Sequence, residues 1–461
     1  MDAITRRIVD YTVGYSKDDL TDAAFTATVN HVVDSIAVGI AGTTAEASRL
    51  AARLASTMRG DPGATVIGLG PGIAPDMAAF ANVVMVRTYD WNDGMQARSG
   101  GHPSDMLPGL LAAGEIAHSC GLDVLIAAAL AYELLGGLGV SVARGHFDQG
   151  LFMGGAVALA AGRLLGLDRE QLGHAASLAL TTALPLGVHR WGALSMTKGA
   201  STAFAVRNGL FSALLAREGF TSAPEPVQGF YGLATALGEF EPRLPVIPGG
   251  PSVMEMSHQK SIPAESQVLG LLGLVPAVRA WTPVEEIESI DVVMSERAAR
   301  HVADEAKFDP QTRETADHSL PFMLAVALLD GDISLDSYRP ERFNDPAVRG
   351  LMATMTVTGS EEFTKLRAEH EGVMRSHPVR VTFRTRSGQV MTEDLRYHKG
   401  HYRDPMTKAD LDVKFDKACR GVVGAAQRDR IRQAWWNVAD APDIAEPVAL
   451  LARFDAPGPQ E

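Results

Sequence analysis

Two short segments of this chain hold most of the side chains that are suited to acid–base chemistry. The first contains Asp90, Asp93 and His102 in a loop rich in glycine. The second places Lys198 after an apolar run, at the start of an alanine-rich segment. An acid, an imidazole and an ammonium group are sufficient to move a proton at a carbon next to a carboxylate without a metal. The rest of the chain must bring these segments together.

Each of these candidates also has an ordinary structural interpretation. Acids beside glycines are typical of a solvated loop, although Tyr89 and Trp91 would partly desolvate them and raise their pKa values. Lys198 also fits a surface lysine whose stem lies on apolar residues. Lys260 lies at an expected domain junction, where ligand clefts are common. From chemistry alone each lysine fits the surface better than a site, and the acids leave both interpretations open.

Metal and cofactor sites are not indicated. Two cysteines are too few for an iron–sulfur cluster, which normally takes about three or four thiolates. Residues 65–72 resemble a strand running into a dinucleotide loop, but Ile73 stands at the third glycine position and no βαβ series follows. The paired spacing of metal ligands is missing among the histidines His102, His118, His146 and His189. We therefore expect neither a metal nor an organic cofactor.

Composition narrows the partners and the location. The 461 residues carry a formal net charge of −13, which argues against nucleic acid because phosphates require a basic surface. The most apolar window, residues 122–140, contains Asp123 and Glu133 and fits a buried helix better than a membrane span. The first residues lack the apolar core of a signal peptide, and two cysteines suit a reducing compartment. We expect a cytoplasmic protein that binds neither membrane nor nucleic acid.

Residues 1–240 show helical periodicity almost throughout. Between a cap at Thr21 or Asp22 and a stop at Gly42, apolar residues recur with a period of about 3.6. Several segments are rich in alanine and glycine, which lets helix backbones approach closely in a dense interior. Further helices are expected over residues 76–86, 107–118, 122–134, 156–165, 169–180 and 202–217.

The pattern changes after a proline-rich connection that begins near Pro242. The runs after it predict strands over residues 287–295 and 351–357, a hairpin over 379–384 and 389–395, and helices again over 411–419 and 428–436. The predicted fold class is mainly α, a large all-helical domain with an inserted smaller α+β domain. The helical domain would take residues 1–258 and 401–461, and the insertion residues 259–400.

Taken together, these segments resemble the MmgE/PrpD family over nearly the whole chain. Any one motif is weak, but their order and spacing together are specific. The motifs are residues 34–37 (DSIA), 89–94 (YDWNDG), 102–104 (HPS), 194–199 (LSMTKG), 207–209 (RNG), 260–265 (KSIPAE) with Gln267, 316–321 (ADHSLP), 405–407 (PMT) and 414–415 (KF).

The resemblance implies a helical domain with a smaller α+β lid, an active site between them and a homodimer. It also implies catalysis without metal or organic cofactor. Carried over motif by motif, Asp90 and His102 are the catalytic pair, while Lys198 and Lys260 bind substrate carboxylates. The sequence does not decide which of Asp90 and His102 is the base.

Further site positions follow from the same resemblance. Asp93 belongs to the first motif and is expected among the substrate-binding residues. His318, or the catalytic residue at position 146 or 148, is a candidate acid for a leaving hydroxyl. A histidine or aspartate of the family falls near residue 147, and either His146 or Asp148 fills that position.

Two expected substrate-site positions depart from the family pattern. Gly94 stands where many members carry threonine, and Phe322 stands where many carry tyrosine. Both changes remove a hydroxyl, and a lost hydrogen bond to a charged group costs about 1.5–3 kcal/mol. We therefore expect a change in substrate preference relative to other members.

The family includes 2-methylcitrate dehydratase, cis-aconitate decarboxylase and iminodisuccinate epimerase. The resemblance therefore implies a cofactor-independent lyase for a small di- or tricarboxylate, most like 2-methylcitrate dehydratase. An epimerase or isomerase of a dicarboxylate and a cis-aconitate decarboxylase are the alternatives, and a non-catalytic carboxylate binder is a third hypothesis.

Overall fold

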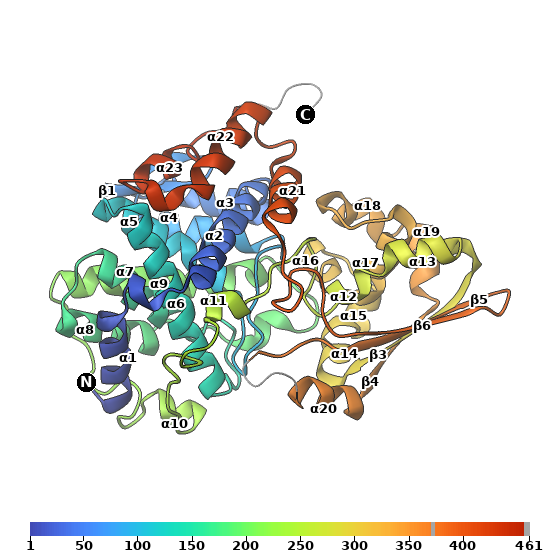
Figure 1. The fold of residues 1–461 in the computed structure, drawn as a ribbon, viewed down its shortest axis with the longest axis horizontal. Helices are drawn as coiled ribbons and strands as arrows, with labels where there is room; N and C mark the ends of the chain where they lie inside the picture. Colours follow the sequence, from blue (N-terminus) through green and yellow to red (C-terminus); the bar gives the residue numbers. More distant parts are fainter. Residues whose placement is uncertain (370–373, 456–461) are drawn as a thin grey trace.

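The computed structural model describes residues 1–369 and 374–455, and its core residues form two separate clusters. The first cluster contains residues from 4 to 256, Met374, and residues from 415 to 451. The second contains residues from 264 to 383. We call the parts built around them the helical unit and the sheet unit. In Figure 1 the helical unit lies on the left and carries both termini, and the sheet unit lies on the right.

Helices make up most of the helical unit, as the apolar spacing predicts. They are α1 (Ala3–Gly14), α2 (Asp22–Gly42), α3 (Glu46–Ala55), α4 (Pro75–Arg87), α5 (Leu107–Ala117), α6 (Gly121–Ser141), α7 (Met153–Leu164), α8 (Arg169–Thr181), α9 (Thr197–Arg217), α10 (Leu233–Leu237), α11 (Val253–Met256), α21 (Lys408–Cys419), α22 (Ala425–Trp436) and α23 (Ala445–Ala449).

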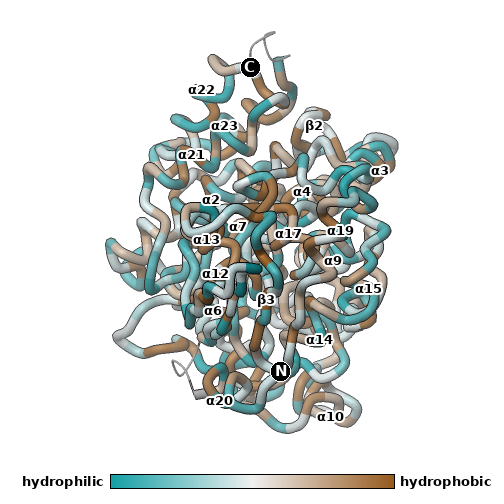
Figure 2. Tube along the Cα trace, turned by 90° about the vertical axis from the view of Figure 1, so that its right-hand side faces the viewer, coloured by the Kyte–Doolittle hydropathy of each residue, from teal (hydrophilic) through white to brown (hydrophobic). Residues whose placement is uncertain are grey.

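The two longest apolar helices, α2 and α6, lie inside this unit. The Thr21 side chain caps α2 by accepting a hydrogen bond from the backbone N–H of Ala24. Both helices are long and apolar enough to cross a membrane, but 72% and 83% of their most apolar windows are buried by other parts of the protein. They pack as core helices do. Figure 2 shows hydrophobic stretches through the middle of the molecule and hydrophilic ones on outer helices such as α3.

The helical unit also contains a small antiparallel hairpin, so the prediction of an all-helical domain was wrong in this detail. Its strands are β1 (Arg59–Val66) and β2 (Gly70–Ile73), paired with Val66 opposite Gly70. Gly68, with φ 74°, lies in the turn between them. The glycines near residue 70 therefore serve a hairpin turn rather than a dinucleotide loop.

The sheet unit combines one sheet with short helices. Its strands are β3 (Ile287–Ser295), β4 (Met355–Ser360), β5 (Val379–Thr385) and β6 (Val390–Leu395). Its helices are α12 (Leu269–Leu272), α13 (Val275–Trp281), α14 (Glu296–Val302), α15 (Glu305–Phe308), α16 (Arg313–Ala316), α17 (Leu320–Asp330), α18 (Pro340–Phe343), α19 (Pro346–Met352) and α20 (Glu361–Glu369).

The strand order in this four-stranded sheet is β4-β3-β5-β6. β3 runs parallel to β4, with Ile290 opposite Met355, and antiparallel to β5, with Val292 opposite Val381. The predicted hairpin is β5 and β6, which turn at Gly388 with φ 84°. The strand predicted over 351–357 begins later, because Leu351 and Met352 bury their side chains at the end of α19. The structure is thus mainly α with a mixed sheet.

Candidate functional site

Asp90 lies at the centre of a buried charge cluster between the two units. It follows α4 after a short turn and has a left-handed backbone, with φ 49°, which an aspartate tolerates better than most residues. Arg87 Nη1 donates to Asp90 Oδ1 at 2.8 Å, and Lys260 Nζ donates to the same oxygen at 2.7 Å. Lys198 Nζ lies 3.5 Å from Oδ2. The carboxylate is 1% exposed at the residue level, so the solvated-loop interpretation was wrong.

These cations fix the charge of Asp90. Burial alone would raise the pKa of the carboxyl group, but Arg87, Lys198 and Lys260 hold it well below its usual range. Asp90 is therefore ionised at neutral pH, and its oxygens are engaged with cations. Such a carboxylate is a poor proton acceptor and a strong electrostatic anchor.

His102 stands beside Asp90 as a neutral imidazole. Its Nδ1 lies 2.5 Å from the Asp93 carbonyl oxygen, which can only accept, so Nδ1 carries the proton. Its Nε2 is then unprotonated and lies 3.8 Å from Asp90 Oδ1. Burial, with Arg87 and Lys260 nearby, lowers the pKa of His102 well below its usual value. The ring presents a free nitrogen lone pair to the charge cluster.

The side chain of Asp93 points away from this cluster and holds the loop in place. Its Oδ1 accepts from the Ser104 hydroxyl at 2.6 Å, and its Oδ2 accepts from the Tyr132 hydroxyl at 2.7 Å. His31 Nδ1 lies 3.1 Å from Oδ2. Because its oxygens are engaged within the helical unit, Asp93 positions His102 through its own carbonyl. Its placement among the substrate-binding residues is not what the geometry favours.

Lys198 and Lys260 are both fully buried, so the surface interpretation of these lysines was wrong. Lys198 lies in the first turn of α9, and its Nζ donates to Asp317 Oδ1 and Oδ2 at 2.9 and 3.0 Å. Lys260 follows α11, where a bridge between Gly94 and His258 joins its segment to the loop of Asp90. Burial lowers the pKa of Lys198, and Asp317 and Asp90 oppose that shift.

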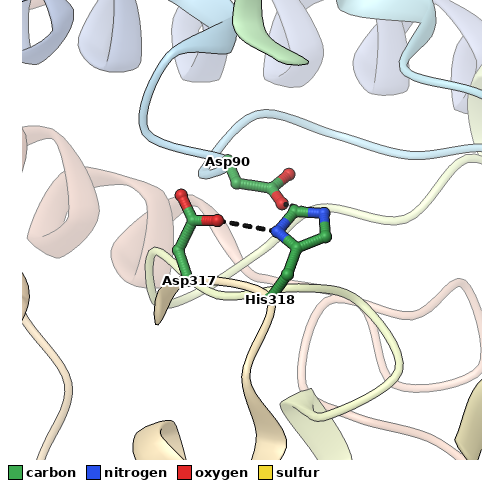
Figure 3. A group of neighbouring side chains, drawn as sticks. All are labelled: Asp90, Asp317 and His318. Carbon is green, nitrogen blue, oxygen red and sulfur yellow. Dashed lines mark hydrogen bonds and ion pairs between the residues drawn. The ribbon is translucent and has the colours of Figure 1, made fainter. Parts of the chain in front are cut away.

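His318 completes the cluster from the sheet unit. Its Nδ1 lies 2.7 Å from Asp317 Oδ1, and its Nε2 lies 3.5 Å from Asp90 Oδ2 (Figure 3). Burial and the nearby Lys198 lower the pKa of His318 to about 4, while Asp317 raises it. His318 therefore lies next to the same carboxylates that bind the lysines.

Asp90, Asp317 and His318 offer ligand atoms within 4.8 Å of one another, a spacing that a metal ion could use. Their oxygens, however, already accept hydrogen bonds from Lys198 and Lys260. A divalent cation would have to displace these ammonium groups from a site that also faces Arg87. The donor set suits an anion better than a metal.

Of the alternatives His146 and Asp148, the structure brings only Asp148 near the cluster. Asp148 accepts from Arg190 Nε at 2.8 Å, and Arg190 Nη1 donates to the carbonyl oxygen of Lys198 at 2.8 Å. This ion pair fixes the first turn of α9, from which Lys198 projects. His146 is exposed, and its carbonyl oxygen accepts from the N–H of Gly187.

The two departures from the family pattern have packing explanations. A Cβ on Gly94 would lie 2.4 Å from the ring of His258, so the imidazole occupies the space of a side chain there. Phe322 is buried in the core of the sheet unit against Phe343, with ring centroids 5.6 Å apart. Phe322 is thus a core residue, and the prediction that it lines the substrate site is not supported by its position.

Sequence reasoning missed three residues that complete the site. Arg87 ends α4 three residues before Asp90, and Asp317 precedes His318 within a motif that was noted. Arg313 stacks on the ring of Tyr89 at 4.3 Å, and its buried Nη2 has no partner among the described residues. Their positions in the sequence were the available signal. Arg87 lies about one helical turn from Asp90, and Asp317 is adjacent to His318. Arg313 lies about one helical turn from Asp317.

Most of the chain matches two domains of one protein family. The MmgE/PrpD N-terminal domain matches residues 6–243, and the MmgE/PrpD C-terminal domain matches residues 268–439. A cis-aconitate decarboxylase-like protein, oryM, of Aspergillus oryzae is 24% identical over 97% of both chains. The mitochondrial 2-methylcitrate dehydratase of Yarrowia lipolytica is 27% identical over 85% of this chain and 79% of its own. The cis-aconitate decarboxylase of Homo sapiens is 24% identical over 100% of this chain and 96% of its own. On these matches, the chain belongs to the MmgE/PrpD family.

Proposed function

We propose that this protein is a cofactor-independent lyase that removes water from a small tricarboxylate, as a 2-methylcitrate dehydratase does. The observation that carries this proposal is a neutral His102, with a free Nε2, beside buried ammonium groups. Relatives named 2-methylcitrate dehydratase, from Yarrowia lipolytica, Cupriavidus necator and Escherichia coli, support the same reaction class.

His102 is the base in this proposal. Elimination of water requires removal of a proton from the carbon next to a carboxylate, and a neutral imidazole can accept it. Asp90 is held ionised by its cations and stabilises the imidazolium that forms, since it lies 3.8 Å from Nε2. The fixed tautomer, with Nδ1 bound to a carbonyl oxygen, directs Nε2 at the reacting carbon.

Lys198 and Lys260 bind the substrate carboxylates. Without substrate they are satisfied by Asp317 and Asp90, and a carboxylate ligand can replace those contacts with equivalent charge-assisted hydrogen bonds. The ammonium groups then stabilise the negative charge that develops on the carboxylate as the C–H bond breaks. Arg313 Nη1 lies 3.4 Å from Asp317 Oδ2, and its Nη2, which has no partner among the described residues, is a further donor for the substrate.

His318 is the acid for the leaving hydroxyl. Lys198 is the nearby charge that most lowers its pKa, while Asp317 and Asp90 raise it. When a substrate carboxylate neutralises Lys198, the pKa of His318 rises, and the ring can carry a proton between two carboxylates. Substrate binding thus prepares the acid.

The sheet unit is the lid in this proposal. Asp90, Lys198, Lys260 and Asp317 each expose 1% or less of their surface, so a substrate reaches them only when the units separate. The ion pair of Lys198 with Asp317 joins the two units directly. A substrate carboxylate would take over that bridging role on closure.

The test is turnover of 2-methylcitrate, citrate and cis-aconitate by the purified chain in the presence of EDTA. We expect an enoate product from a hydroxylated tricarboxylate at an undiminished rate, followed by ultraviolet absorbance. Loss of activity with EDTA, restored by a divalent cation, would show that a metal performs the chemistry. Absence of turnover on all three substrates would refute the proposal.

A cis-aconitate decarboxylase is the second candidate. This candidate is supported by the share of the chain that its relatives match. Relatives named cis-aconitate decarboxylase match 90–100% of this chain, whereas those named 2-methylcitrate dehydratase match 74–87%. The same assay separates the two, since only decarboxylation releases CO₂ from cis-aconitate. Deuterium incorporation from solvent without loss of water or CO₂ would instead indicate an epimerase.

We also infer a homodimer in the cytosol. Phe204 and Phe211, two turns apart on α9, expose 49% and 46% of their surface, which suits burial against a second copy. Cys120 and Cys419 are free thiols, as a reducing compartment allows. Light scattering of the wild type and of F204E/F211E tests the dimer, which the double substitution should dissociate.

A further inference from the structure

A group of arginines without carboxylate partners lies at one end of the boundary between the units. In an acidic chain, most cations on the surface are expected to have acidic neighbours. Within residues 1–369 and 374–455 no ion pair involves these members, which we call the arginine cluster: Arg98, Arg144, Arg297, Arg367 and Arg375.

The arginine cluster draws on both units. Arg98 lies in the loop between Asp90 and His102, and Arg144 Nη1 donates to the Gly100 carbonyl oxygen of that loop at 2.9 Å. Arg297 lies in α14 and Arg367 in α20, two helices that lie side by side next to the sheet (Figure 1). The backbone N–H of Arg375 donates to the Gln96 carbonyl oxygen at 2.8 Å, which ties the segment that leads into β5 to the helical unit.

The guanidinium groups are close enough to affect one another. Burial, together with Arg297 and Arg190, lowers the pKa of Arg144 to about 10, although the Asp148 carboxylate opposes this shift. Burial, together with Arg375, Arg297 and Arg144, lowers the pKa of Arg367 to about 10. Among the described residues, Glu265 opposes the lowering of the Arg367 pKa. The cluster therefore holds an excess of positive charge in a partly desolvated place.

Several buried polar atoms in the same region have no hydrogen-bond partner among the described residues. They include Arg367 Nε, the Ser376 hydroxyl, both ring nitrogens of His377 and the Gln149 side-chain nitrogen. Burial lowers the pKa of His377, and Arg367 is the charged group that adds most to this shift. Gln149 packs against Gly101 in the loop that Arg144 contacts. Buried polar groups are normally hydrogen bonded, and those left unpaired require an explanation. A bound anion with several acceptor oxygens would satisfy these donors together.

We propose that the arginine cluster is an anion-binding site, separate from the lysine pair, that takes a polyvalent oxyanion of the phosphate type. Arginine forks match tetrahedral oxyanions, and a single carboxylate would neutralise only part of this charge. The ligand would bridge Arg144 of the helical unit and Arg297 of the sheet unit. The repulsion between those arginines is greatest when the two units are in contact. Because the bound anion neutralises this repulsion, it stabilises the arrangement in which the units are closed.

The test is binding of inorganic phosphate and pyrophosphate to the full chain by calorimetry at constant ionic strength. Arg297 is exposed, so R297Q should fold, and the matched control is R49Q, an exposed arginine on α3. We expect saturable pyrophosphate binding by the wild type, at least ten-fold weaker binding by R297Q and unchanged binding by R49Q. We also expect R297Q without anion to melt no lower than the wild type, because repulsion is relieved.

Two results would overturn the proposal. One is the absence of saturable binding of either anion at constant ionic strength, or an equal effect of R49Q and R297Q. The other is loss of binding in K198Q with retention in R297Q, which would place the anion on the lysine pair. Neither readout uses turnover, so the proposal and the proposed lyase activity fail or succeed separately.

Discussion

Removal of the Asp317 charge tests how the buried cluster is held together. In D317N, Lys198 loses a carboxylate that accepts two of its hydrogen bonds, at 2.9 and 3.0 Å, without a change in side-chain volume. The ammonium group stays buried, and its remaining carboxylate is Asp90 at 3.5 Å. The amide oxygen can still accept a hydrogen bond from His318.

The expected loss of stability can be worked out in two ways. Removal of one partner from a buried ion pair costs about 3–5 kcal/mol, and the presence of Asp90 places D317N at the lower end. Independently, the pKa of Asp317 is lowered to about 2 by Lys198 and His318 against the opposing effect of burial, from an ordinary value of 3.8. At about 1.4 kcal/mol for each pKa unit, this shift corresponds to about 2–3 kcal/mol. We therefore expect D317N to lower the free energy of unfolding by about 3 kcal/mol.

The sign of the pH dependence follows from the lowered pKa. Asp317 contributes stability that is fully present above pH 3.8 and is lost as the pH falls through about 2. The difference in free energy of unfolding between wild type and D317N should thus be constant from pH 8 to pH 5, and it should become smaller only below pH 4. Urea unfolding followed by circular dichroism measures it, with D336N as the control, because Asp336 pairs with Arg339 on the surface. A D317N protein within 1 kcal/mol of wild type at pH 7, or a D336N protein equally destabilised, would refute the reasoning.

Three further predictions concern the site. H102Q should lower kcat about 10²- to 10⁴-fold with KM changed only a few-fold, because proton transfer but not carboxylate binding is lost; steady-state kinetics that retain a tenth of kcat would exclude His102 as the base. Because the pKa of His102 lies well below its usual value, kcat/KM should stay level as the pH falls to 6.5 and decline only below that, and an acid limb centred at pH 7 would contradict the assignment. G94T should destabilise the fold by about 1–3 kcal/mol, because the added side chain would contact the His258 ring. In a double-mutant cycle, H258A should recover part of that loss of stability. Additive losses in the two single variants would show that the two positions do not interact.

Much of the helical unit could be predicted from periodicity and caps. The helix expected over 107–118 is α5 (Leu107–Ala117), and the one expected over 169–180 is α8 (Arg169–Thr181). α9 begins at Thr197 rather than at residue 202, because its first turn is held by contacts from Arg190 and not by an apolar repeat. The local spacing of apolar residues cannot predict a helix start that depends on contacts with residues outside the helix.

The sheet shows the same limit. The hairpin of β5 and β6 was predictable since its strands are adjacent in the chain and alternate around a glycine turn. The bounds of β4 could not be predicted, because each of its paired residues lies opposite a residue of β3 that is 65 positions earlier in the chain. The β1 and β2 hairpin was hidden by glycines that also fit a phosphate loop.

In the site, motif order identified residues that the fold then brings into contact, including Asp90, Lys198, Lys260 and His318. Their roles could not be read from the chain. Asp93 and Asp90 are alike in sequence, three residues apart, but Tyr132 and Ser104 engage one and cations surround the other. Which acid faces the cluster depends on the left-handed turn at Asp90, a backbone property that residue type alone does not specify.

The charges of the finished site favour one more anion. Arg87, Lys198 and Lys260 are buried cations, and Asp90 and Asp317 are the ionised carboxylates in direct contact with them. Asp148 acts on Arg87 from further away, and the buried Glu265, whose pKa is raised by burial, lies near Lys260. Burial raises the pKa of Asp105, beside Arg87, to about 7, so at neutral pH this group supplies only part of a negative charge. A buried cation without a counterion is costly, and the least costly remedy is a carboxylate that arrives with the substrate. A carboxylate of the substrate would thus complete the contacts of these cations, which supports the proposed binding of a carboxylic acid at this site.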